Sequence, residues 1–201
     1  MKDKNIIYPM GVAQGRFQII HRGHMEYLLE AKKRCRFLYI GMIDMDPGCI
    51  EKFLKDYTVE KDTSKGPYRT YDEGLYCFTF SERALMIQDA LIENGIKAED
   101  FMVVPCPIRR PGLIKYYIPL EAMFLITVYD DWGREKMELL KSIGARVEIL
   151  WERDMASRFT TGTEVRRRIV EGEEWENLVP KAVAKVIKEN NLAEKLRNCM
   201  K

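Results

Sequence analysis

Short apolar runs alternate with amphipathic segments along this chain, and that alternation restricts the fold more than any other feature. The apolar runs have the length and composition of β-strands: Ile7–Ala13, Phe37–Ile43, Phe101–Pro105, Phe124–Tyr129 and Arg146–Leu150. Helical periodicity covers Met25–Lys33, Ser81–Asn94, Arg134–Ser142, Thr163–Glu171 and Lys181–Asn190. Strands that are separated by helices form parallel sheets, because each connection has to cross back over the sheet. The sequence therefore predicts an α/β fold with a doubly wound, Rossmann-like parallel sheet.

The length of the chain predicts a single domain. A chain of 201 residues buries one good core, so we expect residues 1–201 to form one unit. The least periodic stretch, at about 44–77, is interpreted as a charged insert, and the segment at about 161–201 is predicted to be helical. In a sheet of this kind ligands bind at the carboxyl ends of the strands, so the functional residues are sought there.

Composition excludes several classes of function. The formal net charge of +2 provides no general basic field for nucleic acid. No apolar run approaches the roughly 18 residues of a membrane span, and the N-terminus lacks the apolar core of a signal peptide. The five cysteines have no paired spacing, which predicts free thiols in a reducing compartment. We therefore expect a cytoplasmic protein that binds neither membranes nor nucleic acid.

The only two histidines, His21 and His24, lie in the turn between the first predicted strand and the first predicted helix. Such turns bind phosphates, because backbone N–H groups converge there and the helix dipole favours negative charge. Arg16 adds a permanent cation, and Gly23 permits close approach. Three other interpretations stay open: surface residues, a helix cap, or two ligands of a metal ion. A metal site would need a third ligand, and the sequence has no other histidine and no CxxC pair.

A second candidate phosphate site lies far downstream, in Thr160–Ile169. Hydroxyl and N–H groups would be presented at a helix start there by Thr161, Gly162 and Thr163. Arg166 lies near the end of the first turn, where its guanidinium can reach a bound phosphate. The alternative is an ordinary capping box, Thr161 with Glu164, that leads into a basic solvated face. A further helix start places Arg83 in its first turn, which favours the phosphate interpretation.

These strings resemble the signatures of a known superfamily. HRGH matches the HxGH signature of the nucleotidyltransferases, which move a nucleoside monophosphate from a nucleoside triphosphate onto an acceptor. GRFQxxHRGH, FTFSER and TTGTEVRRR are similar, in the same order, to strings of the archaeal-type nicotinamide mononucleotide adenylyltransferases. The likeness spans nearly the whole chain and is strong at the three motifs. It implies the Rossmann-like nucleotidyltransferase fold and an enzyme.

The resemblance also implies a reaction. The expected reaction moves AMP from ATP to nicotinamide or nicotinate mononucleotide, makes NAD and releases pyrophosphate. TGTEVRRR favours adenylyl transfer, because related cytidylyltransferases carry a different final motif. The alternative is the same machinery with CTP, or with another small phosphorylated acceptor; a non-catalytic nucleotide sensor is a further one. Because the archaeal-type relatives are oligomeric, a homo-oligomer is the expected state.

Roles for the motif residues follow from the same resemblance. Stabilisation of charge in the transition state would come from His21, His24, Arg16 and Arg166. The expected nucleotide-binding residues are Gly15, Arg16, Phe17, His21, Gly23, His24, Arg83, Thr161, Gly162, Thr163 and Arg166. Mg²⁺ would accompany the triphosphate, and it keeps most of its waters, so no metal motif need be visible. Its protein ligands stay unknown, with Asp44 or Asp46 as candidates.

The chain departs from the family where the acceptor would bind. The family's aspartate and tryptophan beside the nicotinamide normally follow the third strand, and the segment 106–112 contains neither. We predict that Arg109, Arg110 and Tyr116 bind an anionic acceptor there, because paired arginines suit a phosphate or a carboxylate. The alternative is a solvated loop followed by a helix whose tyrosines, Tyr116 and Tyr117, pack in the core.

Overall fold

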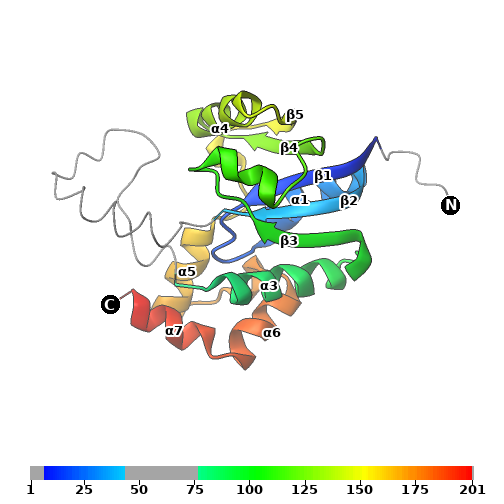
Figure 1. Cartoon of the computed structure of the whole chain (residues 1–201). Helices are drawn as coiled ribbons and strands as arrows, with labels where there is room; N and C mark the ends of the chain where they lie inside the picture. The colour runs from blue at the N-terminus through cyan, green and yellow to red at the C-terminus, as the bar shows by residue number, and fades with distance from the viewer. Residues whose placement is uncertain (1–6, 44–76, 201) are drawn as a thin grey trace.

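The computed structural model describes residues 7–43 and 77–200, which are built around a parallel sheet (Figure 1). Its strands are β1 (Tyr8–Gly15), β2 (Cys35–Met42), β3 (Phe101–Pro105), β4 (Met123–Val128) and β5 (Arg146–Glu152). Their order across the sheet is β3-β2-β1-β4-β5. The chain changes direction across the sheet between β1 and β4, so the carboxyl ends of these two strands form the switch point where ligands bind. The predicted α/β fold is confirmed.

Helices cover both faces of the sheet. They are α1 (Arg22–Arg34), α3 (Phe80–Glu93), α4 (Asp131–Ser142), α5 (Gly162–Glu171), α6 (Lys181–Glu189) and α7 (Leu192–Cys199). The short 3-10 helices are η2 (Ala98–Asp100), η3 (Pro111–Tyr116), η4 (Met155–Ser157) and η5 (Glu176–Leu178). One face packs against α1, α3 and the C-terminal helices, whereas η3 and α4 cover the other (Figure 1).

Two apolar clusters fill the spaces between the sheet and these layers. Neighbouring residues of β1 point to opposite faces, so Ala13 belongs to the larger cluster and Val12 to the smaller one. The larger cluster includes Leu28 of α1 and Val165 of α5, and both side chains are fully buried. The smaller cluster includes Leu140 of α4. The sheet that carries the switch point is therefore packed on both faces, by one apolar cluster on each.

The predicted strands and helices are all present, with ends displaced by a few residues. Helix α4 begins at Asp131 because the side chain of Asp130 accepts a hydrogen bond from the Gly133 N–H (3.0 Å) and caps the helix. The C-terminal segment predicted to be helical contains α5, α6 and α7. The predicted insert at about 44–77 lies almost wholly outside the described residues.

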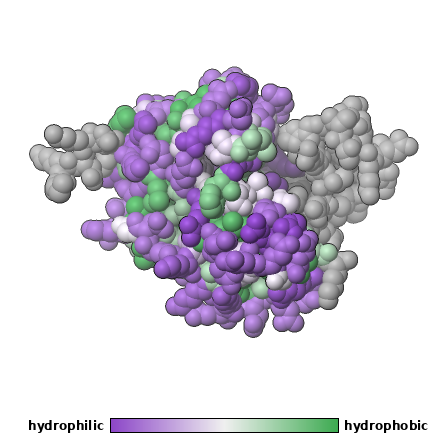
Figure 2. All heavy atoms as spheres, turned by 180° about the vertical axis from the view of Figure 1, so that it is seen from behind, coloured by the Kyte–Doolittle hydropathy of each residue, from purple (hydrophilic) through white to green (hydrophobic). Residues whose placement is uncertain are grey.

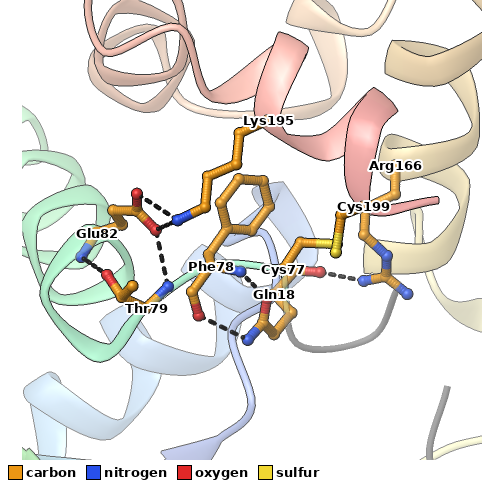
Figure 3. The surroundings of a disulfide bond; sticks show 8 residues. All are labelled: Gln18, Cys77, Phe78, Thr79, Glu82, Arg166, Lys195 and Cys199. Atoms are coloured by element: carbon orange, nitrogen blue, oxygen red, sulfur yellow. Dashed lines mark hydrogen bonds and ion pairs between the residues drawn. A yellow bond between two sulfur atoms is a disulfide. The ribbon is translucent and has the colours of Figure 1, made fainter. Parts of the chain in front are cut away.

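A disulfide joins Cys77 and Cys199, which are 122 residues apart in the sequence (Figure 3). Cys77 precedes α3 and Cys199 ends α7, and an ion pair between Lys195 of α7 and Glu82 of α3 (2.7 Å) links the same two helices. The prediction of free thiols is therefore wrong for this pair, because spacing along the chain does not reveal that α7 returns to the start of α3. The free cysteines among the described residues, Cys35 and Cys106, are buried.

Hydrophilic side chains predominate on the surface seen from behind, where hydrophobic residues appear in small separate patches (Figure 2). The large hydrophobic side chains that are exposed come from separate elements and include Ile7, Met102, Tyr116 and Phe159. None of the helices that the structure describes has both the length and the apolar character needed to cross a membrane.

Candidate active site

The loop between β1 and α1 brings the two histidines together. His21 is the N-cap of α1, and its Nδ1 accepts a hydrogen bond from the backbone N–H of His24 (3.4 Å). The two imidazole rings stack, with centroids 3.7 Å apart. Helix capping, one of the interpretations left open, is therefore observed. Because Nδ1 of His21 accepts, its proton lies on Nε2, which remains able to donate to a ligand.

Both imidazoles are held neutral by their surroundings. Burial, with the positive charges of Arg158 and Arg166, lowers the pKa of His21 to about 4. Burial and the neighbouring His21, Arg158 and Arg16 also hold the pKa of His24 well below its usual value, against a hydrogen bond to the Ile19 backbone. Nδ1 of His24 is buried and has no hydrogen-bond partner within residues 7–43 and 77–200. The cationic surroundings that keep these rings neutral are suited to a polyanion.

Two buried arginines hold the β1–α1 loop by hydrogen bonds to its carbonyl oxygens. Arg83 is 1% exposed and donates from Nη1 to the carbonyl oxygens of Arg16 (2.9 Å) and Ile43 (3.4 Å). Arg166 is 5% exposed, and its Nη1 donates to the carbonyl oxygen of Gln18. Phe17 lies between Arg16 and Gln18, and its φ of 50° is rare for a residue with a large side chain. The arginines therefore fix a strained turn, as expected where geometry serves function.

Phe17 and Gly15 contribute packing to this turn. Phe17 is buried, and its ring meets the ring of His24 edge to face, with centroids 5.0 Å apart. A Cβ on Gly15 would lie 2.9 Å from the Phe17 ring, and one on Gly23 would lie 3.2 Å from the ring of His21. Neither glycine could carry a side chain without displacing an aromatic ring of the loop. Arg16 differs, because it is exposed at the start of the same loop.

The start of α5 lies against this loop. Thr161 is the N-cap and accepts a hydrogen bond from the Glu164 N–H (3.1 Å), and the hydroxyl of Thr163 accepts from Nη2 of Arg166 (3.2 Å). A Cβ on Gly162 would lie 3.0 Å from the carbonyl oxygen of Gln18, so this position has to be a glycine for the two segments to touch. The structure thus brings both predicted phosphate-binding helix starts to one place.

The three successive arginines of α5 have different surroundings. Arg166 is directed inward, toward Cys77 and the disulfide (Figure 3). Arg167 and Arg168 pair at the surface with Glu164, and Arg167 pairs with Glu173 as well (2.8 Å). The basic solvated face proposed as the alternative therefore applies to Arg167 and Arg168 and not to Arg166. The Glu164 carboxylate does not complete a capping box, because these arginines hold it; a complete box is present at Thr79 and Glu82 instead.

Sequence reasoning missed two residues of this site. Arg158 lies with its guanidinium carbon 4.2 Å from the centroid of the Tyr129 ring, and its charge acts on both histidines. Thr160 is 8% exposed, and its hydroxyl oxygen is buried without a hydrogen-bond partner in the described part of the chain. Arg158 precedes the recognised motif, so no local pattern marked it. Thr160 opens that motif and could have been included with Thr161.

A pocket of about 350 Å³ lies at the carboxyl ends of β4 and β5. It is lined by Val128, Tyr129, Asp130, Asp131, Arg134, Glu152, Arg153 and Asp154. Tyr129 of this pocket carries Arg158 on its ring, which connects the pocket to the charged surroundings of the histidines. An aromatic ring with neighbouring carboxylates suits a nucleobase better than a phosphate, because the carboxylates can accept hydrogen bonds from an amino group.

The loop after β3 holds the residues predicted to bind the acceptor. Arg109 and Arg110 are exposed in the turn that leads into η3, and the Arg110 N–H donates to the Pro107 carbonyl oxygen (2.8 Å). Tyr116 is 72% exposed and Tyr117 is 46% exposed. The alternative in which both tyrosines pack in the core is therefore wrong. The arginines leave the sheet at its carboxyl edge, as predicted.

Comparison with known proteins places this site in an enzyme class. The chain is 41% identical over 187 residues to the phosphonoformate cytidylyltransferase of Streptomyces viridochromogenes, a match that covers 93% of this chain and 95% of that protein. It is 30% identical over 192 residues to the nicotinamide-nucleotide adenylyltransferase of Pyrococcus furiosus, with 93% and 87% covered. This chain belongs to the nucleotidyltransferase superfamily, as predicted. Within it, the likeness to the cytidylyltransferase exceeds the likeness to the adenylyltransferases that the motifs resemble.

Solved structures agree on the fold. The bifunctional NMN adenylyltransferase/ADP ribose pyrophosphatase of Francisella tularensis matches with a TM-score of 0.62 and 15% identity over 95% of this chain. The match covers 53% of that protein, so this chain spans about half of its length. No family model matches the chain. As a nucleotidyltransferase, the protein uses a nucleoside triphosphate and a small phosphorylated molecule.

Proposed function

We propose that this nucleotidyltransferase moves CMP from CTP to a small phosphonate that also carries a carboxylate. The observation that carries the proposal is the 41% identity to a phosphonoformate cytidylyltransferase over 93% of the chain, against 30% for the adenylyltransferase of Pyrococcus furiosus. Phosphonoformate is a phosphonate bonded directly to a carboxylate. The acceptor side of the site departs from the nicotinamide-binding pattern, which also favours an acceptor other than a mononucleotide.

The reaction needs no covalent intermediate on the protein. An oxygen of the acceptor phosphonate attacks the α-phosphorus of CTP and forms a new P–O bond. The bond between that phosphorus and the oxygen bridging to the β-phosphorus breaks, and pyrophosphate leaves with the electron pair. Catalysis then consists of holding the two reactants in line and stabilising negative charge.

The residues of the β1–α1 loop and of α5 would supply that stabilisation. The neutral imidazole of His21 donates a hydrogen bond from Nε2 to an oxygen near the α-phosphorus, where charge increases during transfer. His24 donates from Nδ1 in the tautomer that gives up its hydrogen bond to the Ile19 backbone. Arg16 and Arg158 attract the triphosphate, and the start of α5 offers N–H and hydroxyl groups to it. Arg83 and Arg166 act chiefly by position in our proposal, because their guanidinium groups hold the carbonyls of the loop.

Mg²⁺ is expected with the triphosphate and would neutralise charge on the departing pyrophosphate. The described residues contain no group of three side chains that could hold a metal ion. Mg²⁺ is commonly bound by phosphate oxygens and water with few protein ligands, so it does not require such a group. The candidate ligands Asp44 and Asp46 lie outside the described residues.

A second candidate is adenylyl transfer to nicotinamide mononucleotide. Two observations favour it: the resemblance of the three motifs to the archaeal-type enzymes and the 29–30% identity to proteins named for that activity. The pocket beside β4 and β5 carries carboxylates that can accept from the amino group of either base, so it does not separate the candidates.

The test is release of pyrophosphate by the purified protein with each nucleoside triphosphate and each acceptor. We expect CTP with phosphonoformate to give the highest kcat/KM, and mass spectrometry to find the CMP ester of the acceptor. Turnover of ATP with nicotinamide mononucleotide at a higher kcat/KM would establish the second candidate instead. Absence of pyrophosphate release with every pair would favour the nucleotide sensor.

A further inference from the structure

Two buried glutamines at the candidate active site differ in one respect. Gln14 and Gln18 are each 4% exposed. Both ends of the Gln18 amide are paired with Phe78: Nε2 donates to its carbonyl oxygen (3.2 Å), and Oε1 accepts from its N–H (3.3 Å). Nε2 of Gln14 is buried and has no hydrogen-bond partner among the residues that the structure describes. A buried amide group without a hydrogen-bond partner lowers the stability of the protein, so we look for a ligand that pairs with it.

The contacts of Gln14 fix which end of its amide is left over. Its Oε1 accepts a hydrogen bond from the Cys106 thiol, with a sulfur–oxygen distance of 3.4 Å. Burial raises the pKa of that thiol to about 12, so it stays protonated and donates. The thiol is held in place because Cys106 packs on Gly41, the partner of Gln14 in β2; a Cβ there would lie 2.9 Å from Cβ of Cys106. The NH₂ group of Gln14 is therefore the end that stays free.

The face on which this NH₂ group lies is the one covered by η3 and α4. Val12 points into the smaller core cluster, and Gln14, two residues further along β1, points to the same side. Gln14 is also the last residue but one of β1, so its amide lies at the carboxyl edge of the sheet. The predicted acceptor arginines leave the sheet at this edge.

A cation from α4 reaches the same place. Lys136 is half-buried and makes no hydrogen bond or ion pair with any residue in the described ranges 7–43 and 77–200. Burial lowers the pKa of its ammonium group, against the influence of Cys106 and Asp130, and Arg158 lowers it further. Lys136 lies one helical turn before Leu140, whose side chain belongs to the smaller cluster, so Lys136 lies on the face of α4 that is directed to the sheet on the same side as Gln14.

We propose that Nε2 of Gln14 and the ammonium group of Lys136 bind the carboxylate of the acceptor. The inference rests on the proposed function: the phosphonate has to lie at the α-phosphorus of CTP, beside the histidines, so the second anionic group is left for these two donors. A planar carboxylate can accept one hydrogen bond from each on its two oxygens. Gln14 and Lys136 would thus select acceptors that carry an acid group next to the phosphonate.

Steady-state kinetics with two acceptors test this assignment. Phosphonoformate carries the carboxylate, and methylphosphonate carries the same phosphonate without it. We expect Gln14→Leu and Lys136→Met each to raise KM for phosphonoformate by roughly tenfold or more, the effect of losing a hydrogen bond to a charged group. KM for CTP should stay within about twofold, as should kcat/KM for methylphosphonate. Lys141→Met, a change of an exposed lysine on the same helix, is the matched control and should leave all constants unchanged.

Stability separates a ligand-binding amide from a structural one. Gln14→Leu removes an unpaired NH₂ group together with the weak hydrogen bond from the Cys106 thiol, so the Tm of the free protein should change little. Gln18→Leu breaks two buried hydrogen bonds and should lower the Tm. A large loss of Tm in Gln14→Leu would show that the amide supports the fold, and it would overturn the proposal. So would an equal rise in KM for both acceptors, or an equal rise for CTP.

Failure of the proposed function gives a different result. If the protein transfers no CMP to phosphonoformate, the proposed cytidylyl transfer is wrong. Calorimetry then tests the carboxylate site separately. Phosphonoformate is titrated into protein saturated with a CTP analogue that has a methylene group between the α- and β-phosphorus atoms, which blocks the pyrophosphate position. Binding that weakens roughly tenfold in Gln14→Leu supports the carboxylate site. No binding, or equal binding by both proteins, overturns it.

Discussion

Two loops at the carboxyl edge of the sheet differ in how firmly the protein holds them. The loop between β1 and α1 is held by buried arginines that are 1% and 5% exposed and that bind its own carbonyl oxygens. The loop after β3 presents Arg109 and Arg110 to solvent, and Tyr116 beyond it is 72% exposed. The first loop has its geometry before any ligand arrives. In the second, the named side chains lie exposed at the surface.

This contrast explains why the class of reaction is easier to recognise than the substrate. Phosphate groups are the same in every nucleoside triphosphate, so a loop with the phosphate-binding role proposed for the β1–α1 loop can be rigid. Acceptors differ in size and charge, and a loop with exposed side chains can change without disturbing the core. The comparison predicts that changes in the β1–α1 loop affect every substrate, whereas changes after β3 affect one.

The largest effect is expected at the histidines. His24→Ala should lower kcat by roughly a hundredfold with any acceptor, because one preorganised hydrogen bond to the reacting phosphate is lost. His21→Asn is the sharper variant, since asparagine can still cap α1 while the imidazole is gone. A folded His21→Asn protein with normal kcat would reduce His21 to a helix cap and break the comparison.

The neutral state of His21 predicts a dependence of stability on pH. The pKa of about 4 in the folded protein lies below the ordinary value of 6.5, so the unfolded chain takes up the proton first as pH falls. Stability is therefore fully present above pH 6.5 and is lost as pH falls toward 4, by about 3 kcal/mol for this residue. Urea unfolding at several pH values measures the slope.

The same titration has an internal control. His21→Asn removes the titrating group, so its stability should fall less steeply across this window than that of the unchanged protein. His24 and carboxyl groups such as Glu82 remain in the variant, and their titration accounts for the slope that is left. Identical slopes in the two proteins would contradict the buried, neutral imidazole.

A smaller effect is expected at Arg166. Arg166→Lys keeps the charge but loses the planar group that reaches both the Gln18 carbonyl oxygen and the Thr163 hydroxyl. We expect kcat/KM for the nucleotide to fall by roughly tenfold. Arg168→Ala, in the surface network of the same helix, should leave it unchanged. Equal behaviour of the two variants would mean that Arg166 has no special position.

The smallest effect is expected after β3. Arg109→Ala or Arg110→Ala should raise KM for the acceptor by roughly two- to fivefold, because exposed charges contribute about 1 kcal/mol or less. KM for the nucleotide should not change. If both constants rise together, the β3 loop belongs to the nucleotide site, and the division between the two loops is wrong.

Local patterns in the sequence were sufficient for the fold and for the histidine loop. Strand, turn and helix follow one another within a few residues at Gly15–His24, so propensity and spacing locate them without knowledge of the rest. The role of Arg83 had no such signal. Its guanidinium donates to carbonyl oxygens of residues 67 and 40 positions away, a buried supporting position that its place in a helix start did not indicate.

Pairings between distant segments account for what the sequence did not reveal. The role that we propose for Gln14 depends on its contact with Cys106, which lies 92 residues further along the chain. Both residues are ordinary in their own segments, and only the register of β1 with β2 and the turn after β3 bring them together. The disulfide was missed for the same reason, since α7 has to return to the start of α3 before the two cysteines meet.

That disulfide changes how the chain responds to cutting. Cys77 and Cys199 enclose β3, β4, β5 and the last helices in one covalent loop. Exposed points inside the loop, such as η4 with Met155 at 50% exposure, are natural sites for a protease. A single cut there would leave both fragments attached to each other. The nicked protein would migrate as one species on a gel without reductant and separate into two once the disulfide is reduced.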